Sequence, residues 1–132
     1  MTFANASLSN AEKVSEFHTS MGMTNGVWPP TMNELDLRMD LIDEELNELR
    51  DEFDLDLYDD YDKQKIAKEL VDLLYVVYGT AVSFGIPIDE VFDAVHKSNM
   101  SKLVDGKPMY REDGKVLKGP NYQPPQLEFI FK

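Results

Sequence analysis

Cysteine is absent from this 132-residue sequence, which excludes a disulfide-based fold, a thiolate nucleophile and a zinc–sulfur site. Basic residues are also scarce: 13 Lys and Arg stand against 25 Asp and Glu, giving a formal net charge of −12. That balance argues against binding a nucleic-acid polymer, which requires a basic surface. Neither a Walker sequence nor a dinucleotide-binding glycine pattern occurs. These absences remove several common classes of enzyme and binding protein.

Long apolar runs are missing as well, since none approaches the roughly 18 residues of a membrane-spanning helix. Residues 1–5 lack the basic region and apolar core of a signal peptide. We therefore expect no membrane association and, by default, a cytoplasmic location. The 42% hydrophobic and 29% charged residues are typical of a folded protein, not of a disordered one. The length predicts one domain over residues 1–132, with a helical core over about 9–103 and a basic, loop-rich tail over 104–132.

Hydrophobic periodicity predicts an all-α fold, a four-helix bundle followed by an irregular C-terminal tail or small hairpin. The clearest helix covers residues 33–53, where apolar residues recur at intervals of four, three, four, three and four. The other helices are expected over residues 10–21, with Ser9 or Asn10 as the cap, and over 61–84 and 88–103. Residues 54–60 are interpreted as an acidic connector, and a turn at Asp113-Gly114 predicts a hairpin within 109–117.

One carboxylate lies where an isolated charge is costly. Asp72 is part of the apolar run over residues 70–78, and Glu69 lies one helical turn before it. No Lys, Arg or His occurs between Glu69 and Phe84, so we expect no cation close in sequence to neutralise Asp72. Burying an unpaired carboxylate is so unfavourable that the group normally pairs, becomes protonated or binds a metal ion.

A second acidic cluster lies on the helix predicted over residues 33–53, where Glu45 and Glu48 flank the apolar stripe. If this helix packs antiparallel to the next one, these two carboxylates face Glu69 and Asp72 across the interface. Without a metal ion, four carboxylates so placed would raise one another's pKa values. A solvated acidic helix face is the alternative interpretation of Glu45 and Glu48.

Carboxylate oxygens in this arrangement suit magnesium, which usually obtains its remaining ligands from water and substrate phosphates. The predicted site therefore binds a polyphosphate and orients a water molecule for attack on it. Glu44 points away from the stripe and is the candidate to accept the proton of that water or to hold a further metal ion. The two histidines, His18 and His96, are too few and too isolated to predict a zinc site or a catalytic triad.

Basic residues concentrate in one part of this acidic chain. From Lys97 to Lys118 there are six basic residues and only three acidic ones. A locally basic segment suits a phosphorylated ligand that a metal ion bridges to the acidic residues. A solvated tail with incidental lysines is the alternative.

The order and spacing of the acidic residues resemble a known signature. Glu44-Glu45-x-x-Glu48, followed after twenty residues by Glu69-x-x-Asp72, is similar to the motif of the all-α nucleotide pyrophosphohydrolases. That superfamily includes MazG-type enzymes, dimeric dUTPases and phosphoribosyl-ATP pyrophosphohydrolases. The similarity extends from the first predicted helix through residues 96–102. Residues 105–120 resemble the end of the phosphoribosyl-ATP pyrophosphohydrolase-like, MazG-related branch.

The resemblance implies hydrolysis of a nucleoside triphosphate, or a related nucleotide, to the monophosphate and pyrophosphate. It implies that Mg²⁺, or alternatively Mn²⁺, is bound by Glu45, Glu48, Glu69 and Asp72, with Glu44 assisting. By the same analogy, the substrate contacts would come from Asn99, Lys102, Arg111 and Lys118. Members of the superfamily assemble as dimers or tetramers, so a homodimer or homotetramer is expected. The resemblance does not extend to base or sugar preference, nor to roles for His18 and Trp28.

Two alternatives stay open. One is the hydrolysis of phosphoribosyl-ATP, which nothing in the residues separates from the hydrolysis of nucleoside triphosphates. The other is a catalytically silent oligomeric helical module that has kept the fold. The presence of all five acidic residues disfavours the silent module, because such a module has no reason to keep Asp72 in an apolar setting.

Overall fold

A computed structural model describes residues 7–54 and 61–131, and within them the chain is mostly helical. The described elements are α2 (Asn10–Met21), α3 (Met32–Phe53), α4 (Lys63–Phe84), α5 (Ile88–Met100), β1 (Met109–Tyr110) and β2 (Val116–Leu117). The all-α prediction is confirmed, and the two short antiparallel strands form the small hairpin expected in the tail. The predicted connector falls almost wholly on residues 55–60, outside the described residues.

Contacts divide the chain between Ile86 and Pro87 into two compact units. The first unit contains α2, α3 and α4, and the second contains α5 and the hairpin. The prediction of one domain over residues 1–132 stays a prediction. Among the described residues, no single helix has the length and apolar composition to cross a membrane, and α4 with α5 meets that test only when the two are counted together.

Local side-chain hydrogen bonds explain where the helices of the first unit begin and end. The Ser9 hydroxyl accepts from the Glu12 backbone N–H at 3.2 Å, and the Glu12 carboxylate accepts from the Ser9 N–H at 2.9 Å. This capping box starts α2 where the sequence predicts it. The carboxylate of Asp62 caps α4, so this helix begins at Lys63, two residues later than predicted. Gly85 ends α4 with a left-handed φ of 69°.

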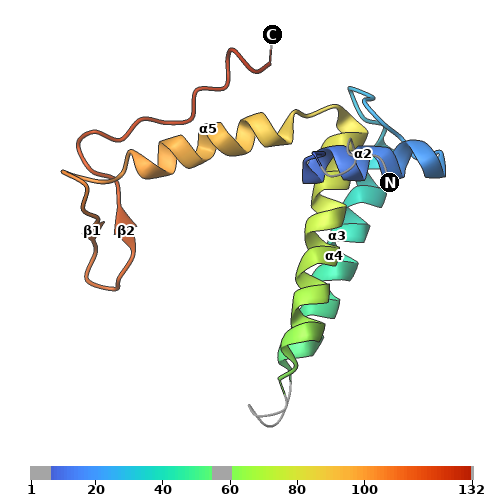
Figure 1. Cartoon of the computed structure of the whole chain (residues 1–132), viewed down its shortest axis with the longest axis horizontal. Helices are drawn as coiled ribbons and strands as arrows, with labels where there is room; N and C mark the ends of the chain where they lie inside the picture. Colours follow the sequence, from blue (N-terminus) through green and yellow to red (C-terminus); the bar gives the residue numbers. More distant parts are fainter. Residues whose placement is uncertain (1–6, 55–60, 132) are drawn as a thin grey trace. The chain divides into compact units, whose positions relative to one another are not determined.

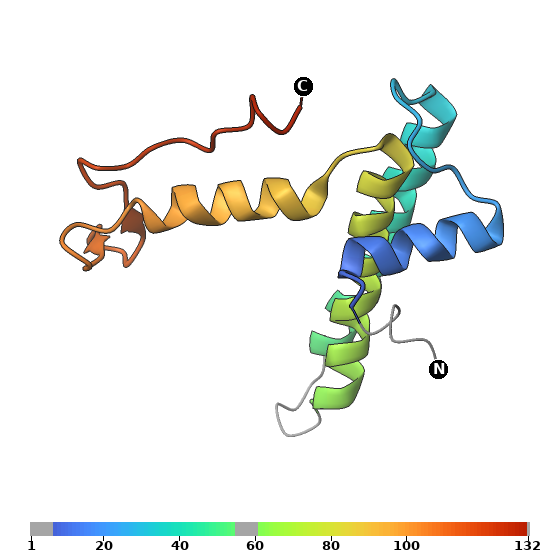
Figure 2. The same ribbon diagram turned by 45° about the horizontal axis from the view of Figure 1, so that its top comes forward.

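Helices α3 and α4 lie side by side and antiparallel (Figure 1), and α2 runs across the pair and packs against α4 (Figure 2). This arrangement places the middle of α3 opposite the middle of α4. It is the arrangement that the acidic motif requires, because the two halves of that motif lie on these two helices.

A buried guanidinium lies inside the α3–α4 interface. Arg38 on α3 is only 2% exposed. Its Nη2 donates to the Val76 carbonyl at 3.1 Å, and its Nε donates to the Thr80 hydroxyl at 3.3 Å. Burial lowers the pKa of Arg38, while the nearby charge of Glu34 opposes that change. Arginine keeps its charge under such conditions, so the interface contains a cation bound chiefly by neutral oxygens of α4.

Glycine at position 79 makes room for this guanidinium. A Cβ atom at Gly79 would lie 2.4 Å from Arg38 Nη2 and 3.0 Å from His18 Nε2. His18 is also only 2% exposed, and its Nδ1 lies 2.8 Å from the Thr24 carbonyl. The sequence left the role of His18 open, and the structure places it in the packing of α2 against α4.

The apolar surface of α4 is only partly covered within the chain. Within the first unit α4 packs against α3 and α2, and the side chains of Leu70, Val71, Leu74 and Tyr75 are exposed. An apolar run of this kind therefore does not guarantee burial within a single chain. Exposed apolar residues grouped on one helix are typical of a surface that binds another protein.

In the second unit, the tail is joined to the end of α5 by hydrogen bonds. The Ser98 hydroxyl donates to the Gln123 carbonyl at 2.7 Å, and the Ser101 hydroxyl accepts from the Gln123 N–H at 2.9 Å. Helix α5 ends at Met100, three residues earlier than predicted. The tail that follows is thus fixed to α5 although it contains little regular structure.

The contact between Gly79 and Arg38 leads to a prediction with an unusual sign. Glycine to alanine inside a helix normally stabilises a protein by about 1 kcal/mol. We expect Gly79→Ala instead to destabilise this protein by about 1–3 kcal/mol in urea unfolding, because the added methyl overlaps the guanidinium.

The double variant Arg38→Met/Gly79→Ala is the control. Removing the guanidinium should reduce the penalty of the alanine, which a double-mutant cycle measures as a coupling between the two positions. Simple additivity of the two substitutions would contradict this account of Gly79.

Candidate metal centre

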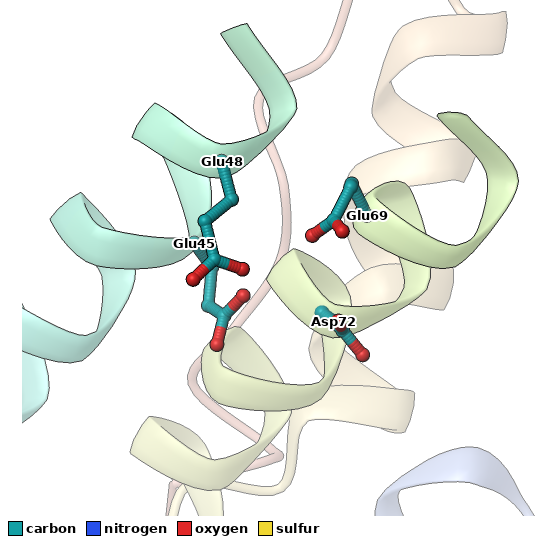
Figure 3. A group of neighbouring side chains, drawn as sticks. All are labelled: Glu45, Glu48, Glu69 and Asp72. Carbon is teal, nitrogen blue, oxygen red and sulfur yellow. The ribbon is translucent and has the colours of Figure 1, made fainter. Parts of the chain in front are cut away.

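Four carboxylates from two helices converge at the α3–α4 interface. Glu45 and Glu48 extend from α3, and Glu69 and Asp72 extend from α4 (Figure 3). Each residue offers one oxygen, and these four oxygens all lie within 4.8 Å of one another. The proximity expected from the sequence is therefore observed, while the role of these residues as metal ligands stays a prediction.

The spacing of the residues explains this convergence. The two members of each pair are three positions apart, about one helical turn, so both lie on the same side of their helix. The antiparallel arrangement then turns one pair toward the other. The Arg38 contacts lie on the same interface, about two turns from Glu45 along α3 and one to two turns from Asp72 along α4. They fix the position of one helix along the other.

Two oxygens of the cluster lack a partner. Glu45 Oε2 and Glu69 Oε2 are buried and accept no hydrogen bond in the described structure. An unsatisfied buried acceptor is costly, and a carboxylate oxygen is the ligand that magnesium and manganese prefer. The cluster therefore has both the unsatisfied oxygens and the donor chemistry that suit a hard divalent cation.

The electrostatics agree with that assignment. The pKa of Glu45 is raised, first by burial and then by the charges of Glu48, Asp72 and Glu44. Burial also raises the pKa of Glu69, with further contributions from Glu48 and Asp72, although the charge of Lys68 acts in the opposite direction. Like charges in close proximity raise one another's pKa values, and a bound cation reverses that effect.

Two expectations about Asp72 are wrong. Its side chain is 33% exposed, not buried, because the face of α4 on which it lies is only partly covered. It also has a cationic neighbour: Lys68 Nζ lies 2.8 Å from Asp72 Oδ2. Lys68 precedes Asp72 by four residues, a spacing that brings two side chains together on a helix. The signal for this pair is thus present in the sequence, because Lys68 directly precedes Glu69.

The other predicted site residues lie outside the four-carboxylate cluster. Glu44 is exposed on α3 next to Glu45, and its charge contributes to the raised pKa of Glu45. The four predicted substrate contacts all belong to the second unit: Asn99, Lys102, Arg111 and Lys118. Arg111 pairs with Asp113 within the hairpin, and Lys118 Nζ lies 4.7 Å from the centre of the Tyr122 ring.

Comparison with known protein families identifies the family of this chain. The chain matches the phosphoribosyl-ATP pyrophosphohydrolase family over residues 14–99. It belongs to this family. The match includes α3 and α4 with all four clustered carboxylates, and the family is part of the MazG-like all-α superfamily that the acidic motif resembles. No curated protein matches the chain. Family membership identifies the protein as a hydrolase that acts on pyrophosphate bonds.

The raised pKa of Glu45 predicts a pH dependence of stability. A carboxyl group whose pKa is raised by folding contributes stability below its unfolded pKa, near 4.5, and loses that contribution as the pH rises through the folded pKa. Glutamine does not ionise, so the Glu45→Gln variant does not lose this stability as the pH rises. In EDTA, we therefore expect its Tm, relative to that of the wild type, to be higher at pH 7 than at pH 4.

The same variant should respond less to metal. Mg²⁺ or Mn²⁺ should raise the Tm of the wild-type protein at pH 7 and raise that of Glu45→Gln far less, because the variant lacks one carboxylate ligand. Asp40→Asn, which removes an exposed carboxylate of α3 outside the cluster, is the matched control and should respond to the metal as the wild type does. Equal responses of Glu45→Gln and the wild type would remove Glu45 from the site.

Proposed function

We propose that this protein is a metal-dependent nucleotide pyrophosphohydrolase that releases pyrophosphate from a triphosphate-bearing nucleotide and leaves the monophosphate. The observation that carries the proposal is the convergence of four carboxylates across the α3–α4 interface, in a chain of the phosphoribosyl-ATP pyrophosphohydrolase family. Acidic residues alone would repel a polyphosphate. A substrate of that charge is compatible with this site only when a cation lies between the two.

The proposed metal ligands are Glu45, Glu48, Glu69 and Asp72. Magnesium, or manganese in its place, would neutralise charge on the polyphosphate and activate water for attack on phosphorus. Its binding would also satisfy the buried oxygens of Glu45 and Glu69 that have no hydrogen-bond partner. The family membership and the unsatisfied oxygens together support this assignment.

The remaining roles belong to residues around the ligands. Glu44, exposed beside Glu45, is proposed as the base that accepts a proton from the attacking water. Asn99, Lys102, Arg111 and Lys118 are proposed to contact the substrate phosphates. For Arg111 this role requires that its guanidinium exchange Asp113 for phosphate, since the two are paired within the hairpin.

Two substrate classes follow from different observations. Phosphoribosyl-ATP is favoured by the matched family. A nucleoside triphosphate is the first expectation from the acidic motif, which MazG-type enzymes share. Both substrates carry a triphosphate, and a metal ion held by the carboxylate cluster would bind this common part of the two molecules.

Assembly, domain organisation and location complete the proposal. We infer a homodimer or homotetramer, because the exposed apolar side chains of Leu70, Val71 and Leu74 suit an interface between copies of the chain. Residues 1–132 are proposed to act as one domain, and a metabolic enzyme family favours the cytoplasm.

Product analysis tests the reaction. Purified protein with Mg²⁺ is incubated separately with phosphoribosyl-ATP and with each common nucleoside triphosphate, and the products are resolved by chromatography and phosphorus NMR. We expect pyrophosphate together with the corresponding monophosphate, with phosphoribosyl-ATP the better substrate. Release of inorganic phosphate and a diphosphate would contradict the proposed bond cleavage.

A single substitution tests the site. Asp72→Asn keeps the size of the side chain but weakens a metal ligand, so turnover should fall by about 100-fold or more while the helical circular dichroism stays unchanged. Asp40→Asn on the exposed face of α3 should retain activity within about twofold. Full activity of Asp72→Asn would exclude this carboxylate from catalysis.

A further inference from the structure

Lys68 is placed where it interacts with the proposed metal ligands directly. Its Nζ lies 2.8 Å from Asp72 Oδ2 and 3.6 Å from Glu69 Oε1. No other ion pair involves the cluster carboxylates within residues 7–54 and 61–131. Within the described part of the chain, the ammonium is therefore the one positive charge paired with the cluster, and it pairs with the two carboxylates of α4.

The ammonium and a divalent ion compete for the same two carboxylate groups, those of Asp72 and Glu69. Metal coordination uses the lone pairs of the Asp72 and Glu69 carboxylates, and a positive charge held beside the ion repels it. Binding of the ion through these residues therefore favours movement of the Lys68 ammonium away from Asp72. The side chain is 68% exposed, so solvent screens the pair and the flexible stem can move at little cost.

A displaced ammonium remains close to the site, because Lys68 directly precedes Glu69 in α4. A metal-bound polyphosphate brings new negative charge to the same place. Lysine binds phosphate as a mobile point charge and does not require the fixed geometry of arginine. Lys68 can thus exchange a carboxylate partner for a phosphate partner without any change in α4.

We propose that Lys68 is an exchangeable cation of the carboxylate cluster: it pairs with Asp72 and Glu69 before the metal ion binds and then binds the pyrophosphate part of the substrate. The inference rests on the proposed metal-dependent function and adds a substrate-binding residue to it. It predicts that removing the ammonium has opposite effects on two affinities, which a purely structural role would not produce.

The test measures binding, not turnover. Isothermal titration calorimetry gives the affinity for Mn²⁺ without substrate, and then the affinity for inorganic pyrophosphate at saturating Mg²⁺. Lys68→Met should bind Mn²⁺ about two- to fivefold more tightly, since an exposed ion pair that competes with the metal is lost. It should bind pyrophosphate about fivefold more weakly, since a charged contact to phosphate is lost.

Two further variants separate pairing from net charge. Lys65→Met removes the same charge from an exposed position of α4 about one turn earlier, outside the ion pairs of the cluster, and should change both affinities by less than about twofold. Lys68→Arg keeps the charge at the site and should retain most of the pyrophosphate affinity.

The outcomes distinguish this inference from the function on which it rests. If the wild-type protein binds no divalent ion, the proposed function and the role of Lys68 both fail. If the wild type binds the ion and pyrophosphate but Lys68→Met changes neither affinity, or changes both as Lys65→Met does, the role of Lys68 alone is overturned. Looser Mn²⁺ binding by Lys68→Met would also overturn it.

Discussion

The arrangement of the first unit depends on one guanidinium. Arg38 enters the α3–α4 interface next to Gly79 and donates to the backbone of Val76 and the hydroxyl of Thr80. Hydrogen bonds to named atoms of α4 specify one position of the two helices along each other, whereas apolar contacts alone would tolerate several. The acidic residues lie on the same interface, so the position that satisfies Arg38 is also the position that brings the four carboxylates together.

That arrangement is costly in electrostatic terms. Burial and the neighbouring carboxylates raise the pKa values of Glu45 and Glu69, and one oxygen of each residue is left without a hydrogen-bond partner. The proposed divalent ion would offset the cost, so metal affinity and folding stability would be two measures of the same interaction. The interface thus has the buried guanidinium of Arg38 on one part of its length and the four clustered carboxylates, proposed to bind a metal ion, on the next part. The hydrogen bonds of Arg38 hold the two helices together and so keep the four carboxylates close to one another.

The features that the sequence predicts well are those encoded by neighbouring residues. Caps such as Ser9, stop signals such as Gly85, and the spacing of the acidic pairs depend on short stretches of chain, and the structure agrees with them closely. The burial of Arg38 could not be predicted, because it requires Gly79 on a different helix at the opposing position. The exposure of Val71 and Leu74 could not be separated from burial, because an apolar helix is typical both of a core and of an interface between chains. The pairing of Lys68 with Asp72 is an intermediate case: its i,i+4 spacing is a local signal, but Lys68 lies just outside the apolar run that contains Asp72.

The hydrogen bonds between Gln123 and the two serines of α5 have a consequence for the end of the chain. Gln123 lies 22 residues after Ser101 and 25 residues after Ser98, so these bonds close a loop that contains the hairpin and its basic residues. Loss of residues from Gln123 onward would remove these bonds and release the loop at one end. Gln123 thus ties the basic segment to the end of α5, and a fusion partner or affinity tag that displaced this residue would free the segment.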